Sequence, residues 1–219
     1  MTGEFTCIFN KLGELTTFAS FPPGSEILRT IRLTGREKTA YGVSVPSPVG
    51  HALGGAVVAV AALPLGLGTW GLRLGSSGWL VVAAAVAPDV DFLWGRHNQE
   101  THSIAAAIAA GLVVLAWKRD ARLAAAVTIA WLSHVLFDWL GSDTTPPLGV
   151  KAFWPLSSDY YFSNAFFFEA ISRRYWLDNF ISHNLWAVAR EILILGPPLA
   201  IVMSIRWRAR RRFRRPDTA

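Results

Sequence analysis

Five apolar blocks, separated by short polar stretches, occupy most of this chain beyond residue 50. They run over residues 51–67, 78–93, 102–117, 122–140 and 186–205. Each is near the ~17–25 residues that an apolar helix needs to cross a bilayer. Small residues dominate the third and fourth blocks, which favours close packing between helices. The pattern therefore predicts an all-α fold, a polytopic membrane helical bundle of about five transmembrane helices.

The residues outside the blocks divide the chain into three parts. Residues 1–45 are mixed, polar and poorly periodic, and they lack the basic stretch followed by an apolar one that marks a signal peptide. Two interpretations of this segment stay open: a poorly ordered tail, or an assigned start that lies too early, with translation beginning at Val43 or Val45. Residues 46–206 form the predicted membrane-embedded domain, and residues 207–219 form a basic tail.

The composition supports a membrane protein. Hydrophobic residues make up 52% of the chain and charged residues only 16%, with a mean hydropathy of +0.34, whereas about a quarter of a soluble domain is charged. The single cysteine, Cys7, excludes an internal disulfide and a cysteine-based metal site. Seven arginines lie between Arg206 and Arg215. Because these arginines directly follow an apolar block, they indicate that this end of the chain lies against anionic lipid. No nucleic-acid partner is expected.

The distribution of lysine and arginine predicts the orientation. With five crossings, Arg73, the loop Lys118–Arg122 and the C-terminal tail share one side, which collects eleven basic residues against five on the other side from residue 46 onward. Basic residues favour the cytoplasmic side, so the C-terminus is predicted to be cytoplasmic. Residues 1–45 oppose this orientation, because they would add five basic residues to the outer side.

On this map, all five histidines and the aspartates near the membrane fall at one face. The topology rests on lysine and arginine alone, so this clustering is an independent result. His183, which precedes the last block, is expected to be structural. Taken alone, His97 is expected to be a surface loop residue. The residues that share this face with His183 are His51, Asp89, Asp91, His97, His102, His134 and Asp138.

The spacing of these residues sharpens the hypothesis. His134 and Asp138 are four apart and share one face of a helix, and ionisable residues inside apolar segments are candidates for function. His102 opens the third block, where the positive end of a helix disfavours the imidazolium and Thr101 or Ser103 can cap the first turn. A neutral imidazole is the form that a metal binds. Histidine and carboxylate ligands without thiolate suit Zn²⁺, with Mn or Fe as alternatives.

Short motifs in the same region resemble a known family. They are "PSPVGHALGG" (46–55), "PDVD" (88–91), "HNQETHS" (97–103), "WLSHVLFD" (131–138), "GV" (149–150) and "WP" (154–155). In this order they are similar to the bacterial YdjM-like family, inner-membrane proteins described as metal-dependent hydrolases and as LexA-binding. The resemblance covers about half the chain. It implies a multi-pass protein of the bacterial inner membrane with a metal site. The candidate ligands that the resemblance implies are His51, Asp89, Asp91, His97, His102, His134 and Asp138.

The chemistry expected of such a site is hydrolysis. A bound Zn²⁺ could lower the pKa of its water to ~7, and Asp89 or Asp91, whichever does not bind metal, could act as the catalytic general base. A site at the bilayer surface suits an ester or phosphoester of a lipid or another amphiphile. The aromatic-rich loop from Phe153 to Trp176 is expected either to lie in the membrane interface or to be buried against the helix ends.

Two other interpretations compete with a metal-dependent hydrolase. "PSPVGH" and "HVLFD" faintly resemble motifs of the phosphatidic-acid phosphatases, but those enzymes hold phosphate with an arginine upstream of the second histidine, and residues 124–133 contain none. The stronger alternative is a non-enzymatic protein, either a metal-binding membrane scaffold or an adaptor that uses its basic tail.

Overall fold

The computed structural model describes residues 7–9, 15–17, 46–64, 66–68, 71–94, 98–142, 148–163, 165–172 and 174–213. Within them, five α-helices carry the fold: α2 (Pro48–Ala62), α3 (Ser76–Val86), α4 (Ile104–Lys118), α5 (Ala121–Leu140) and α6 (Phe180–Phe213). A 3-10 helix, η1 (Ala87–Trp94), continues α3. Two pairs of short antiparallel strands complete the described elements: β1 (Cys7–Phe9) with β2 (Leu15–Thr17), and β3 (Gly66–Gly68) with β4 (Gly71–Arg73).

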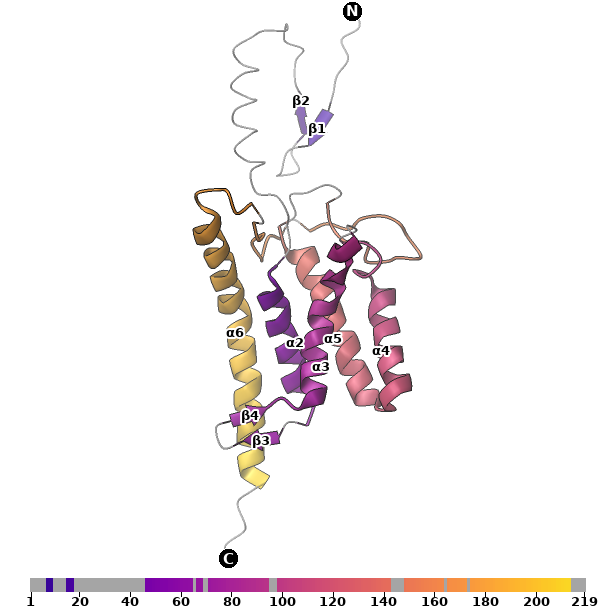
Figure 1. The fold of residues 1–219 in the computed structure, drawn as a ribbon, viewed down its shortest axis with the longest axis vertical. Coiled ribbons are helices and arrows are strands. Elements are labelled where there is room, and N and C mark those ends of the chain that lie inside the picture. The colour runs from indigo at the N-terminus through magenta and orange to yellow at the C-terminus, as the bar shows by residue number, and fades with distance from the viewer. Residues whose placement is uncertain are drawn as a thin grey trace, which may run out of the picture.

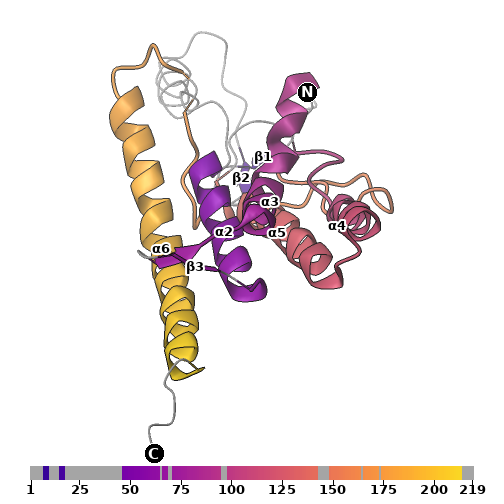
Figure 2. The same cartoon turned by 60° about the horizontal axis from the view of Figure 1, so that its bottom comes forward.

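The helices stand side by side as a bundle (Figure 1). The helices α2, α3 and α5 pack on one another, α4 packs on α5, and α6 packs on α2. As a result, α4 and α6 lie on opposite sides of the bundle in both views (Figures 1 and 2). The starts of α2, α4 and α6 and the end of α5 share one end, the upper end of Figure 1, whereas the α4–α5 turn and the C-terminal end of α6 lie at the other.

Local sequence signals explain where three of the helices begin. The Ser47 hydroxyl accepts a hydrogen bond from the backbone N–H of Gly50, and Pro48 occupies the first helical position of α2. Ser103 caps α4 in the same way, which confirms one of its two predicted caps. The Asp120 carboxylate caps α5 by accepting from the N–H of Leu123.

Small residues bring the helices close together, as the sequence predicted. A Cβ added to Gly111 of α4 would lie 1.9 Å from the Thr128 hydroxyl of α5. One added to Gly55 of α2 would lie 2.7 Å from the Cβ of Ala85 in α3. Because such contacts are sterically forbidden, glycine is required at both crossings, and dispersion contacts between closely approaching backbones hold the bundle together.

Three of the five helices are long and apolar enough to cross a membrane: Ser76–Leu93, Ala121–Leu140 and Phe180–Arg211. The helices α2 and α4 have 15 residues each, about 22 Å at 1.5 Å per residue, which is less than the ~30 Å of a hydrocarbon core. The bundle therefore confirms the helical fold and three candidate spans, whereas five crossings stay a prediction.

The first apolar block departs from expectation in its second half. Helix α2 ends at Ala62, and residues 66–68 form strand β3 instead of continuing the helix. The reason is Pro64, whose ring disfavours the helical conformation of the preceding residue, Leu63, which is extended.

Candidate metal centre

Four elements converge at the upper end of the bundle and bring most of the candidate ligands together. His51 lies in the first turn of α2, and Asp89 lies in η1. His102 directly precedes α4, and His134 and Asp138 lie one turn apart on α5. His51, His102, His134 and Asp138 are buried, and the Asp89 side chain is 13% exposed. We call these five residues the His–Asp cluster.

The ligand atoms of four of these residues face one another. The Nε2 atoms of His102 and His134 are 3.1 Å apart. Asp138 Oδ2 lies 3.1 Å from His102 Nε2 and 3.2 Å from His134 Nε2. Asp89 Oδ1 lies 3.6 Å from His134 Nε2 and 3.9 Å from His102 Nε2. Four atoms bound at ~2.1 Å around one tetrahedral ion are ~3.4 Å apart, so these side chains could hold a metal ion.

The Nδ1 nitrogens of His102 and His134 point away from these ligand atoms, and each has a polar partner. His134 Nδ1 lies 2.8 Å from the carbonyl oxygen of Ala85. His102 Nδ1 lies 3.1 Å from Asp91 Oδ2 and 3.0 Å from the hydroxyl of Thr101, which itself donates to Asp91. Such partners fix the tautomer and the orientation of a metal-binding imidazole. They leave Nε2 of both rings directed into the cluster.

Asp91 therefore occupies a different place from the one expected. It contacts the Nδ1 side of His102, which is the side away from His134, and the groups of potential ligands among the described residues include Asp89 but not Asp91. The local reason is the tight 3-10 helix, which turns Asp89 and Asp91 in different directions although only one residue separates them.

Several buried polar atoms of the cluster lack a well-formed hydrogen bond to the protein. Both ring nitrogens of His51 and both carboxylate oxygens of Asp138 are buried without a protein hydrogen bond of acceptable geometry. Leaving such a group unsatisfied costs about 1–3 kcal/mol, and native interiors contain few of them. A cation bound among these atoms would satisfy lone pairs on both residues.

His102 has a raised pKa in the metal-free protein. Burial lowers the pKa of His102, but the adjacent Asp138 and Asp91 carboxylates raise it, to about 9. These two carboxylates act against the positive end of α4, which was expected to favour a neutral His102. A metal bound at Nε2 must displace this proton.

The structure describes one of the two remaining histidines. His97 falls outside the described residues. His183 Nε2 lies 2.7 Å from the carbonyl oxygen of Ala170, which ties the loop before α6 to that helix and agrees with the structural role expected for it.

One buried acid was missed by the sequence analysis. Glu191 of α6 is fully buried and accepts a hydrogen bond from the backbone N–H of Ser47 at 2.5 Å and another from the Ser47 hydroxyl. A Cβ on Gly50 would lie 2.8 Å from the Glu191 carboxyl carbon. Glu191 thus holds the start of α2, and with it His51. Its signal was present, because an acid inside an apolar block is itself a candidate for function.

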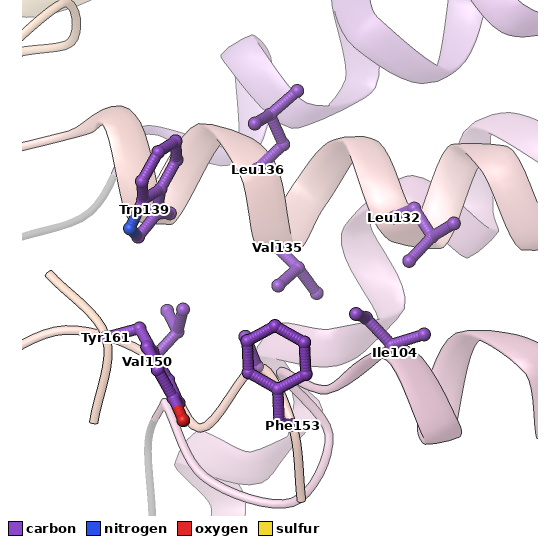
Figure 3. A pocket seen from close by; sticks show the side chains of 9 residues that line it. Ile104, Leu132, Val135, Leu136, Trp139, Val150, Phe153 and Tyr161 are labelled. Carbon is purple, nitrogen blue, oxygen red and sulfur yellow. The ribbon is translucent and has the colours of Figure 1, made fainter. Parts of the chain in front are cut away.

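The aromatic-rich loop is partly buried against the helix ends and partly exposed. Phe168 is buried and packs against Phe137 of α5, whereas Leu156, Tyr175 and Trp176 are exposed. The loop also closes an apolar cavity of about 300 Å³ against α5 and the start of α4. Figure 3 shows Trp139 and Val135 of α5 facing the loop across this cavity. The apolar face of α5 that lines the cavity does not carry His134 or Asp138.

Comparison with known proteins gives one match. A sequence model of the YdjM inner membrane protein family matches residues 47–212. The matched region contains all five residues of the His–Asp cluster, as well as Asp91 and Glu191. Searches of curated proteins and of solved structures give no significant match.

Proposed function

We propose that this chain, which belongs to the YdjM inner membrane protein family, is a membrane-bound metal-dependent hydrolase. The observation that carries the proposal is the His–Asp cluster, in which buried nitrogen and oxygen atoms face one another at ligand spacing and His51 and Asp138 lack hydrogen bonds. Zn²⁺ is the cation that this donor set suits best, because it combines imidazole and carboxylate and lacks thiolate.

The residues of the cluster take different roles in this proposal. His102, His134 and Asp138 hold the cation, and Asp91 orients His102 through Nδ1. When bound, a divalent cation supplies Lewis acidity and activates water as a nucleophile. Asp89 is the most exposed member of the cluster, at 13%, so a substrate or water reaches the cluster beside it. Its carboxylate is therefore placed to accept a proton from water as a general base.

The substrate class we propose is an ester or phosphoester of a lipid or another amphiphile. The apolar cavity lies at the same end of the bundle as the cluster and is large enough for part of an acyl chain.

The test combines metal analysis with turnover. Purified protein is assayed for bound metal and for hydrolysis of lipid esters and phosphoesters in mixed micelles, next to His134→Ala and the control His183→Ala. We expect His134→Ala to lose metal and activity while staying in the membrane, and His183→Ala to retain both. Activity that survives removal of the metal would contradict the proposal.

A second candidate function is a metal-binding scaffold without catalysis. The observation in its favour is the nearly complete burial of His51, His102 and His134, since structural metal sites are closed whereas catalytic ones keep an open position. Stoichiometric metal without turnover on any ester or phosphoester would favour this function.

A further inference from the structure

The imidazoles of His51 and His134 form a stacked pair at the centre of the His–Asp cluster. Their ring centroids are 3.7 Å apart and their planes differ by 19°. His51 comes from α2 and His134 from α5, so the stack joins two helices of the bundle. Neither ring has a solvent-accessible edge, because both residues are fully buried.

This stacking bears on how many cations the cluster can hold. A metal bound to an imidazole lies near the plane of the ring, along the lone pair of the ligating nitrogen. Two nearly parallel rings 3.7 Å apart lie in different planes and therefore direct their lone pairs toward two separate points. In two-metal hydrolytic sites the cations are ~3.5–4 Å apart.

The Asp138 carboxylate lies between these two points. Its Oδ2 atom is 3.2 Å from His134 Nε2 and 3.1 Å from His102 Nε2. Its Oδ1 atom is 3.3 Å from His51 Nε2. Oδ2 thus faces His102 and His134, whereas Oδ1 faces His51. A carboxylate that bridged two cations would be arranged in this way.

His51 is not part of the ligand group that His102, His134 and Asp138 form. Its Nε2 faces the second oxygen of Asp138 rather than the atoms gathered around Oδ2, and neither of its ring nitrogens makes a protein hydrogen bond in the described part of the chain. A nearby Asp89 oxygen completes a group with His51 and His134 in which all ligand atoms lie within 4.8 Å.

We propose that the cluster binds two divalent cations. The first is held by His102, His134 and Asp138 Oδ2, and the second by His51, Asp138 Oδ1 and Asp89. The inference rests on the metal centre of the proposed function and does not depend on hydrolysis. In this two-cation arrangement Asp89 is a ligand and not the general base.

Metal counting and spectroscopy test the proposal. Full-length protein in detergent is stripped with a chelator, reloaded with Mn²⁺ and analysed for Mn per chain and by electron paramagnetic resonance. We expect two Mn²⁺ per chain with an exchange-coupled spectrum. His51→Ala should keep one Mn²⁺ with the spectrum of an isolated ion, and the matched control His183→Ala should keep the coupled pair.

The outcomes separate this proposal from the proposed function. One Mn²⁺ per chain in the unaltered protein, with the spectrum of an isolated ion, overturns the second site even where His51→Ala fails to fold. Turnover with a single cation would then still support the proposed hydrolase function. Two coupled cations without turnover would support this inference and favour the scaffold. No bound metal at all would overturn both.

Discussion

At the scale of single residues, the behaviour of the His–Asp cluster depends on which partner each imidazole nitrogen meets. His102 meets Asp91 at Nδ1 and the cluster at Nε2. The two carboxylates hold a proton on His102 in the metal-free protein, with a pKa of about 9 against an ordinary value of 6.5. Metal and proton therefore compete for the same nitrogen.

We expect metal affinity to rise with pH below about 9. One proton leaves His102 when the metal binds, so the apparent affinity should increase about tenfold for each pH unit in this range. Because the folded-state pKa of His102 is raised, its contribution to the stability of the metal-free protein is complete below pH 6.5 and is lost as the pH rises through about 9. Zn²⁺ titrations between pH 6 and 8 measure the first effect, and thermal unfolding of the stripped protein measures the second.

The variant Asp91→Asn separates this explanation from a general loss of structure. Without the Asp91 carboxylate the pKa of His102 falls, so the pH dependence of metal binding should shift to lower pH. The imidazole also loses an orienting partner, which typically costs 10–100-fold in metal affinity. An unchanged pH dependence would contradict the role assigned to Asp91.

At the scale of elements, α6 determines how α2 presents His51. Glu191 binds the backbone and the hydroxyl of Ser47, and Gly50 leaves room for its carboxylate. Three helix starts and one helix end meet at the upper end of the bundle (Figure 1). The position of the first ligand therefore depends on a helix that contributes no ligand to the cluster.

Replacing Glu191 should loosen this contact. We expect Glu191→Ala to lower the free energy of unfolding by about 1–3 kcal/mol, because the buried N–H and hydroxyl of Ser47 lose their acceptor. The matched control is Glu169→Ala, which removes a partly exposed ion pair with Arg190 and should change stability by less than about 1 kcal/mol. Unfolding in detergent, followed by the intrinsic fluorescence of the tryptophans, compares the two. Equal losses would contradict the capping role of Glu191.

At the scale of the whole molecule, the cluster and most of the basic residues from residue 46 onward belong to opposite ends. The cluster occupies the upper end in Figure 1, whereas the α4–α5 turn with Lys118 and Arg119, strand β4 with Arg73, and the C-terminal end of α6 lie at the lower end. The positive-inside tendency then favours a cytoplasmic C-terminus and a metal centre near the outer face.

Fusion reporters test this orientation. A reporter after Ala219 should read as cytoplasmic, and one inserted at the exposed Ser158 should read as external, because eleven basic residues lie on the side of the tail and five on the other side from residue 46 onward. The opposite pair of readings would place the metal centre at the cytoplasmic face and would mean that residues 1–45 outweigh the tail.

Much of the architecture was readable from the amino-acid sequence. The apolar blocks located all five helices because helix length and apolarity are local properties of the chain. The end at which the ionisable residues meet also followed, because successive antiparallel helices return a chain to the same end. Pro64 is the local signal for the early end of α2. The helix stops before this proline, although the apolar block continues to residue 67.

Only the tertiary structure decided which atoms meet. The spacing of Asp89 and Asp91 did not reveal that one faces the cluster and the other the back of His102. Neither the stacking of His51 on His134 nor the contact of Glu191 with Ser47 could be read from the chain. Periodicity tells which residues share a face of one helix, but the rotation of each helix about its axis is set by packing with its neighbours. Here the close contacts at Gly55 and Gly111 set that rotation.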